Sequence, residues 1–233
     1  MKSLSQNVRI DMSGRVLKNT AMPGASVGGL YAITPDELDT AELLHKVRLA
    51  LLGGARAVQY RNKIADAALR LEQAAALRGL TREFSVPLII NDDVALAVKV
   101  DANGVHLGGD DGSVADARAL LGNGKLVGVS CYNRLELAHQ AVRQGADYVA
   151  FGSFFCSTVK PGAVAATPEL LRQARRELTL PIVAIGGITP QNGAQLIGAG
   201  VNALAVISAV FAAPDVEGAA KEFSNLFEQG KPA

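Results

Sequence analysis

Tryptophan is absent from the 233-residue chain, and the aromatic residues together make up only 5%. Cysteine is almost absent, since only Cys131 and Cys156 occur and they form no Cys-x-x-Cys pair. This content excludes a disulfide framework and a cysteine-based zinc or redox motif. Two isolated cysteines are typical of reduced thiols, and we therefore expect a cytoplasmic protein.

The chain also lacks an excess of charge of either sign and a long apolar run. Its formal net charge is +1, so no broad basic field is present to bind nucleic acid. No stretch of about 18 apolar residues could span a membrane, and residues 1–27 are polar and mixed rather than signal-like. We therefore expect small-molecule ligands, no nucleic-acid or membrane partner, and an N-terminal extension over residues 1–27.

Hydrophobic residues are plentiful, at 49%, and glycine occurs 24 times. Short β-rich runs alternate with helical patterns over residues 28–230, which is typical of βα units that build a parallel sheet. Eight units favour a closed barrel, and no Gly-x-Gly-x-x-Gly turn points to a doubly wound sheet. We predict an α/β fold, a single-domain (β/α)8 TIM barrel. Its strands are expected at 29–34, 57–62, 87–92, 104–108, 126–132, 148–154, 181–188 and 203–210, each followed by a helix.

Polar residues follow the predicted strands at the end of the barrel where barrel enzymes place their active sites. Arg61, Lys63 and Lys160 supply positive charge, and Asp92 and Asp111 supply carboxylates. Magnesium binds one or two carboxylates together with phosphate oxygens and water, so the set predicts a magnesium–diphosphate site. The alternative, in which these charges only pair with one another, stays open. The same rim carries Gln59, Asn62, Asn91, Asp93, Asp110, Ser130, Ser157 and Thr158, of which Asp93 and Asp110 suit helix starts or loops.

A second feature lies at the last two predicted strands. Gly186 and Gly187 end the seventh strand, and Ile207 and Ser208 lie on the eighth. Barrels often hold a phosphate between the loops that follow these strands, because glycines let backbone N–H groups approach an anion. The pattern predicts a phosphate site, with a glycine-requiring tight turn as the alternative.

Histidine is scarce, and none of the three is expected to act as a base. His106 falls inside the fourth predicted strand, where a hydrogen-bonded barrel residue is the favoured interpretation. His45 and His139 lie on helical patterns and are expected to face solvent. Ser130 in Gly128-Val129-Ser130 lacks the second glycine of a nucleophile elbow, so the sequence predicts no protein nucleophile.

In their order and spacing, eight short stretches and one loop lysine resemble the thiamine phosphate synthase family across roughly 29–228. They are YAIT (31–34), VQYRNK (58–63), IINDDVALA (89–97), GVHLGGDD (104–111), VGVSC (127–131), GADYVAFG (145–152), the loop residue Lys160, PIVAIGGI (181–188) and AVIS (205–208).

The resemblance implies a Mg²⁺-dependent transferase. It would join a hydroxymethylpyrimidine diphosphate to a thiazole phosphate, giving thiamine phosphate and pyrophosphate. The pyrimidine diphosphate would be held by Gln59, Arg61, Lys63, Asn91, Ser130 and Lys160, of which Arg61, Lys63, Ser130 and Lys160 would be catalytic. Mg²⁺ would be held by Asp92 and Asp111, and the thiazole phosphate by Ser157, Gly187, Ile207 and Ser208, with Thr158 beside them.

Three positions depart from the family pattern. Gly109 stands where the family usually has Gln, Cys156 where it has Pro, and Ser157–Lys160 where it reads Thr-x-Thr-Lys. Val159 therefore lacks a hydroxyl that Ser157 or Thr158 would have to supply.

Two other functions remain open. A thiazole tautomerase would share the barrel and the phosphate site, but it would need no diphosphate clamp. A non-catalytic sensor would bind a phosphorylated ligand without turnover. The residues also leave open a homo-oligomer and a carboxylated thiazole acceptor.

Overall fold

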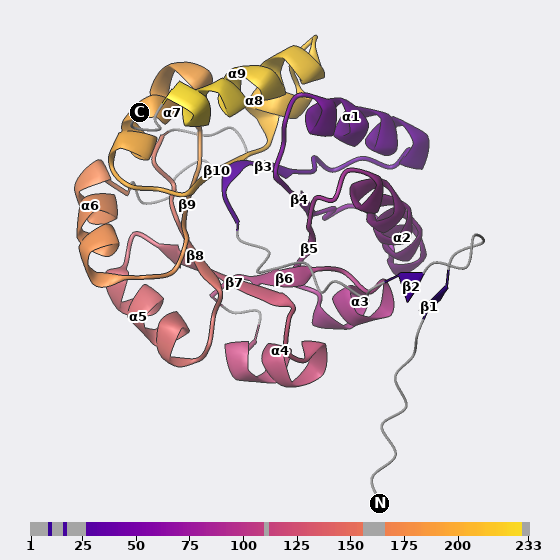
Figure 1. The fold of residues 1–233 in the computed structure, drawn as a ribbon, viewed down its shortest axis with the longest axis horizontal. Helices are drawn as coiled ribbons and strands as arrows, with labels where there is room; N and C mark the ends of the chain where they lie inside the picture. The colour runs from indigo at the N-terminus through magenta and orange to yellow at the C-terminus, as the bar shows by residue number, and fades with distance from the viewer. Residues whose placement is uncertain (1–8, 11–15, 18–26, 110–111, 156–165, 230–233) are drawn as a thin grey trace, which may run out of the picture.

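The computed structural model describes residues 9–10, 16–17, 27–109, 112–155 and 166–229. Eight parallel strands close into a barrel in the order β10-β3-β4-β5-β6-β7-β8-β9, with the helices on its outside (Figure 1). The predicted TIM barrel is therefore confirmed. The barrel strands are β3 (Gly29–Ile33), β4 (Ala57–Tyr60), β5 (Leu88–Asn91), β6 (Gly104–Leu107), β7 (Leu126–Tyr132), β8 (Tyr148–Phe151), β9 (Ile182–Ile185) and β10 (Ala203–Val206).

A helix follows every barrel strand, and several of these helices begin at a side chain that caps their first backbone N–H groups. Asp39, Asp66, Asp93, Ser113 and Thr167 each accept such a hydrogen bond, which satisfies donors that lack a partner within the helix. The expectation that Asp93 starts a helix is confirmed. The helices are α1 (Thr40–Leu52), α2 (Ala67–Glu83), α3 (Val94–Lys99), α4 (Val114–Leu121), α5 (Leu135–Arg143), α6 (Pro168–Glu177), α7 (Pro190–Gly198), α8 (Ser208–Phe211) and α9 (Val216–Gln229).

The eighth strand is shorter than predicted. Residues 207–210 were expected to continue it, but β10 ends at Val206 and α8 begins at Ser208. Ile207 has φ −112° and ψ −85°, which is not extended backbone. The sequence stays apolar beyond the end of β10 because α8 buries Val210 and Phe211. Buried helices and buried strands are equally apolar, so the run alone could not separate them.

The N-terminal part before the barrel contains a short antiparallel pair, β1 (Arg9–Ile10) and β2 (Val16–Leu17). Val27 is buried and belongs to the cluster inside the barrel. The role of residues 1–27 as an extension stays a prediction. In the part of the chain that the structure describes, no helix is long and apolar enough to cross a bilayer.

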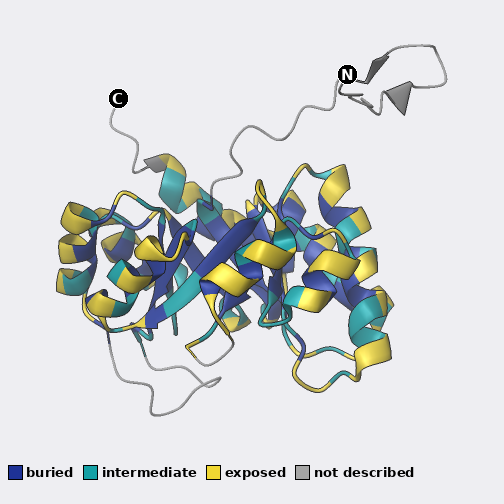
Figure 2. Cartoon of the chain, turned by 90° about the horizontal axis from the view of Figure 1, so that it is seen from below, coloured by how far each residue is buried: buried dark blue, intermediate teal, exposed yellow. Residues whose placement is uncertain are grey.

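Alternate residues along each strand face opposite sides of the barrel wall and build two cores. The larger lies between the sheet and the helices, and Figure 2 shows the buried strands enclosed by helices whose outer faces are exposed. The smaller lies inside the barrel and contains large side chains such as Tyr31 and Tyr148. It also contains Ala150 and Ala205, whose small side chains leave space inside the barrel.

One close approach inside the barrel requires glycine. A Cβ added at Gly128 on β7 would lie 2.0 Å from Cζ of Tyr148. Tyr148 is fully buried on the neighbouring strand β8, paired in register with Gly128. The ring can occupy the barrel interior only because residue 128 has no side chain.

We therefore expect Gly128→Ala to destabilise the fold by about 1–3 kcal/mol, the usual cost of overpacking a core. The matched control is Gly79→Ala on α2, where an added Cβ has nothing within 4 Å; it should stabilise by about 0.5–1 kcal/mol through helix propensity. Urea unfolding of both variants measures the difference. Equal stabilities for the two variants would contradict the close approach.

Candidate active site

A cavity of about 840 Å³ opens at the carboxyl ends of the barrel strands. Its walls come from loops after β4, β7, β9 and β10, and its deeper lining includes Tyr31, His106, Ala150 and Ala205. A cavity of this size suits a small organic ligand. The structure brings together at this cavity the predicted residues Gln59, Arg61, Asn91, Ser130, Gly187, Ile207 and Ser208.

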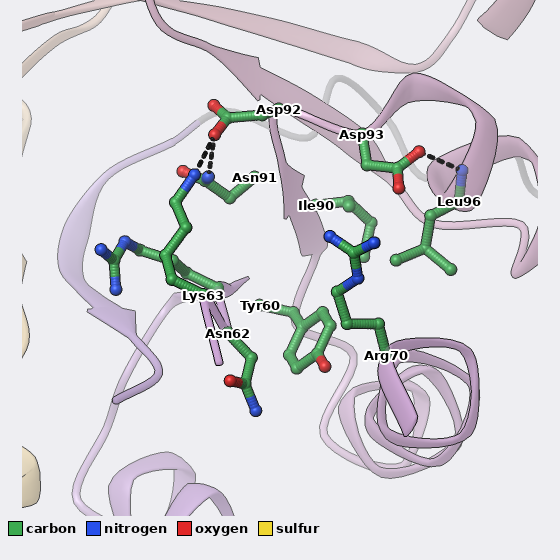
Figure 3. A pocket seen from close by; sticks show the side chains of 10 residues that line it. Tyr60, Asn62, Lys63, Arg70, Ile90, Asn91, Asp92, Asp93 and Leu96 are labelled. Atoms are coloured by element: carbon green, nitrogen blue, oxygen red, sulfur yellow. Dashed lines mark hydrogen bonds and ion pairs between the residues drawn. The ribbon is translucent and has the colours of Figure 1, made fainter. Parts of the chain in front are cut away.

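A smaller pocket of about 170 Å³ adjoins it between the ends of β4 and β5 (Figure 3). Arg61 and Asn91 line both the cavity and the smaller pocket, so the two spaces lie side by side. Lys63 and Asp92 line the smaller pocket. The predicted clamp residues from the second and third βα units therefore lie at one location.

Asp92 is held in a defined position. Its Oδ2 accepts hydrogen bonds from Nζ of Lys63 and from Nδ2 of Asn91, both at 2.6 Å (Figure 3). Its backbone N–H donates to the carbonyl oxygen of His106 at 2.8 Å, and its φ of +62° turns the chain sharply after β5. Asparagine and aspartate tolerate this conformation better than most residues do.

The donor chemistry at Asp92 fits magnesium. The Asp92 carboxylate is 26% exposed and lines a pocket of about 170 Å³, which suits an ion that keeps several waters and substrate oxygens as ligands. Within the described ranges, no cluster of three or more His, Cys, Asp or Glu could hold a metal. The second predicted ligand, Asp111, lies outside the described residues.

Arg61 and Lys63 are supported by the loop after β3. Oδ1 of Asp36 accepts from the Lys63 backbone N–H at 2.7 Å and lies 3.3 Å from Nη1 of Arg61. Thr34 adds two hydrogen bonds of 2.9 Å, since Oγ1 donates to the Arg61 carbonyl oxygen and accepts from its N–H. These contacts hold the β4 end in place while both cationic heads stay at the pocket.

The residues of the predicted phosphate site lie where β9 and β10 end. Gly186 and Gly187 both have positive φ, +106° and +62°, and a Cβ at Gly186 would lie 2.1 Å from Oγ of Ser153. The turn thus requires glycine at Gly186, as the tight-turn alternative proposed. The turn also lines the cavity together with Ile207 and Ser208, so the interpretation as a phosphate site stays open beside the interpretation as a tight turn.

Four predicted site residues, Asp111, Ser157, Thr158 and Lys160, lie outside the described residues, as do Asp110, Cys156 and Val159. The departure at Gly109 is described. Its N–H donates to the hydroxyl of Tyr132 at 3.2 Å, and an added Cβ would lie 3.1 Å from that oxygen. Tyr132 therefore occupies space that a longer residue at 109 would need.

Sequence reasoning missed a row of polar side chains inside the barrel. The hydroxyls of Tyr31 and Tyr148 lie 2.9 Å apart, and the Tyr148 hydroxyl lies 3.1 Å from Nδ1 of His106. Burial lowers the pKa of His106 to about 4, with a smaller opposing effect from the charge of Asp92. His106 is therefore neutral at neutral pH and hydrogen-bonded, as expected of a barrel residue.

Arg70 was also missed, because it comes from helix α2 rather than from a strand end. Figure 3 shows its guanidinium reaching from α2 toward the end of β5. Its Nε is buried without a hydrogen-bond partner in the described structure, which is unfavourable for a charged group. Arg61 and Lys63 have carboxylate partners, and no ion pair of Arg70 occurs among the described residues.

The fold and the cavity define a class: a (β/α)8 barrel with a small-molecule site at the carboxyl ends of its strands. The sequence model of the family described as thiamine monophosphate synthase matches residues 30–210. The chain belongs to that family.

Individual relatives agree with this assignment. A thiamine-phosphate synthase of Thiobacillus denitrificans is 55% identical over 200 residues, covering 86% of this chain and 95% of the relative. One of Nitrosospira multiformis is 48% identical over 98% of this chain and 95% of its own. A solved thiamine phosphate pyrophosphorylase of Pyrococcus furiosus superposes with a TM-score of 0.79 at 38% identity, covering 86% and 96% of the two chains.

We expect Arg70→Met to weaken binding of inorganic pyrophosphate, the leaving group that the family resemblance implies. A hydrogen bond to a charged group contributes about 1.5–3 kcal/mol, so the dissociation constant should rise roughly 10-fold or more by calorimetric titration. Arg82→Met, which removes an exposed arginine from the same helix, should leave it unchanged. Equal affinities for wild type and Arg70→Met would show that Arg70 does not contact the anion.

Proposed function

We propose that the chain condenses 4-amino-2-methyl-5-(diphosphooxymethyl)pyrimidine with a thiazole phosphate to give thiamine phosphate and pyrophosphate. Membership of the thiamine monophosphate synthase family carries the proposal. The geometry supports it, because one cavity with an adjoining charged pocket offers room for two phosphorylated substrates.

In this reaction the C–O bond between the pyrimidine methylene and the diphosphate breaks, and pyrophosphate leaves with the electron pair. The aminopyrimidine ring stabilises the positive charge left on the methylene carbon, and the thiazole nitrogen then forms the new C–N bond. Each step occurs between the substrates, so no side chain has to act as a nucleophile. The protein has to align the two substrates and stabilise the negative charge that grows on the leaving group.

Arg61, Lys63 and Lys160 would bind the diphosphate, and Asn91 would contact it between the two pockets. Gln59 and Ser130 would hold the pyrimidine. The thiazole phosphate would bind at Gly187, Ile207 and Ser208, with Ser157 and Thr158 from the preceding loop completing that site.

Asp92 and Asp111 would hold Mg²⁺, which when bound supplies positive charge that neutralises diphosphate oxygens. Lys63 already lies 2.6 Å from Oδ2 of Asp92, so this lysine can shift to the substrate when the carboxylate takes up a metal. We propose a cytoplasmic enzyme that acts on small molecules.

The activity is tested with purified protein, both substrates and Mg²⁺. We expect thiamine phosphate and pyrophosphate in equal amounts, followed by chromatography and a coupled pyrophosphate assay. A tautomerase would convert the thiazole phosphate without releasing pyrophosphate, and a sensor would bind ligand without forming either product. Either result would overturn the proposed reaction.

The metal is tested with Asp92→Asn, which keeps a residue that tolerates the positive φ and removes only the charge. Loss of this electrostatic contact should lower turnover about 10²–10³-fold, and EDTA should abolish the wild-type reaction until Mg²⁺ is added. The control is Asp93→Asn, because Asp93 caps α3 through Leu96 N–H and asparagine caps helices equally well. Full turnover in EDTA would refute magnesium dependence.

A further inference from the structure

Five polar side chains form a continuous hydrogen-bonded row across the barrel interior. Nε2 of Gln59 donates to the Tyr31 hydroxyl at 2.8 Å, and that hydroxyl lies 2.9 Å from the hydroxyl of Tyr148. Nδ1 of His106 lies 3.1 Å from Tyr148, and Nε2 of His106 lies 2.9 Å from Oγ of Ser130. Gln59 and Ser130, at the two ends, are proposed ligand contacts, whereas the three middle residues have no role in the proposed reaction.

The donors along this row can be ordered from one end. The Gln59 amide nitrogen can only donate, so the Tyr31 hydroxyl accepts from it and has its own proton left for Tyr148. Tyr148 then donates to Nδ1 of His106. A neutral imidazole carries one proton, so His106 must hold it on Nε2 and donate it to Ser130. The serine proton is left to point into the cavity.

With the Gln59 amide nitrogen facing Tyr31, the reverse order leaves a buried proton unsatisfied. If His106 carried its proton on Nδ1, Tyr148 would accept from it and donate to Tyr31. The Tyr31 proton and the N–H of Gln59 would then be two donors that face each other. Among the described residues, the Tyr31 hydroxyl has no further partner that could accept its proton. Leaving a buried donor without an acceptor is costly.

We propose that Tyr31, Tyr148 and His106 are positioning residues that fix the direction of the protons between Gln59 and Ser130. Ser130 is thereby a hydrogen-bond donor to the ligand, and the Gln59 carbonyl oxygen is an acceptor. The row recognises a ligand with an N–H donor at one end and an acceptor, a ring nitrogen or phosphate oxygen, at the other. Its use for an aminopyrimidine diphosphate rests on the proposed function; the proton order does not.

The proton order is measured without any substrate. In ¹⁵N-histidine-labelled protein, long-range ¹H–¹⁵N spectra separate a protonated ring nitrogen from a bare one, and loss of a signal in His106→Asn assigns it among the three histidines. We expect wild-type His106 to be protonated only on Nε2. A His106 protonated on Nδ1 would overturn the proposal.

Tyr31→Phe tests whether the order is set from the Gln59 end. The change removes one hydroxyl from the row and leaves the contacts of His106 with Tyr148 and Ser130 intact. Tyr148 can then accept as well as donate, so we expect both tautomers of His106 to appear. The matched control, Tyr60→Phe, removes a buried hydroxyl that contacts Gln73 outside the row and should leave the single tautomer. If His106 in Tyr31→Phe is still protonated only on Nε2, the proton order is not set from the Gln59 end, and Tyr31 is not a positioning residue.

The catalytic consequence is tested by pairing Tyr31→Phe with Ser130→Ala. One misdirected hydrogen bond should lower kcat/KM for the pyrimidine diphosphate about 3- to 10-fold. In the Ser130→Ala background the same change should have no further effect, because the residue that it directs is gone. Equal losses in both backgrounds would overturn the positioning role, whereas absent turnover in wild type would instead refute the proposed function.

Discussion

The hydroxyl of Tyr148 lies inside the barrel between two partners, the hydroxyl of Tyr31 and Nδ1 of His106. A buried hydroxyl needs such partners, because its loss of hydration is otherwise uncompensated. The ring also lies edge-on to Tyr31 and stacked on His106, with centroids 6.1 and 5.6 Å apart. The shape of the cavity above therefore depends on this one side chain and on the glycine that makes room for it.

The sequence was sufficient to predict the architecture, and three of the predicted rim residues lie at one pocket. Alternating βα units predict the barrel, and the rule that barrel sites lie at strand ends finds Arg61, Lys63 and Asp92. That rule cannot find Tyr31 and Tyr148, which are 117 positions apart. Their contact depends on which strand residues face inward and at what height, and this is fixed only when the sheet closes. Arg70 escaped for a related reason, since a helix places its head at the rim from outside the barrel.

The charges at the rim illustrate how two interpretations of a pattern can both hold. Lys63 pairs with Asp92 and Arg61 with Asp36, as the interpretation of mutually paired charges expects. Such partly exposed pairs contribute at most about 1 kcal/mol each. The diphosphate of the proposed substrate would therefore replace these pairs at little cost.

The barrel is closed by its first and last strands, since β10 pairs with β3 along four residues, and α9 packs on α1. During synthesis on the ribosome, β3 emerges early, but β10, one of its two neighbours in the sheet, emerges almost last. Until then the nascent sheet has open edges, which can pair with other chains. A chain released before β10 would keep such an edge permanently. The barrel can therefore close only after translation is nearly complete. We expect a truncated chain to associate with other chains through its open sheet edge rather than to form a smaller barrel.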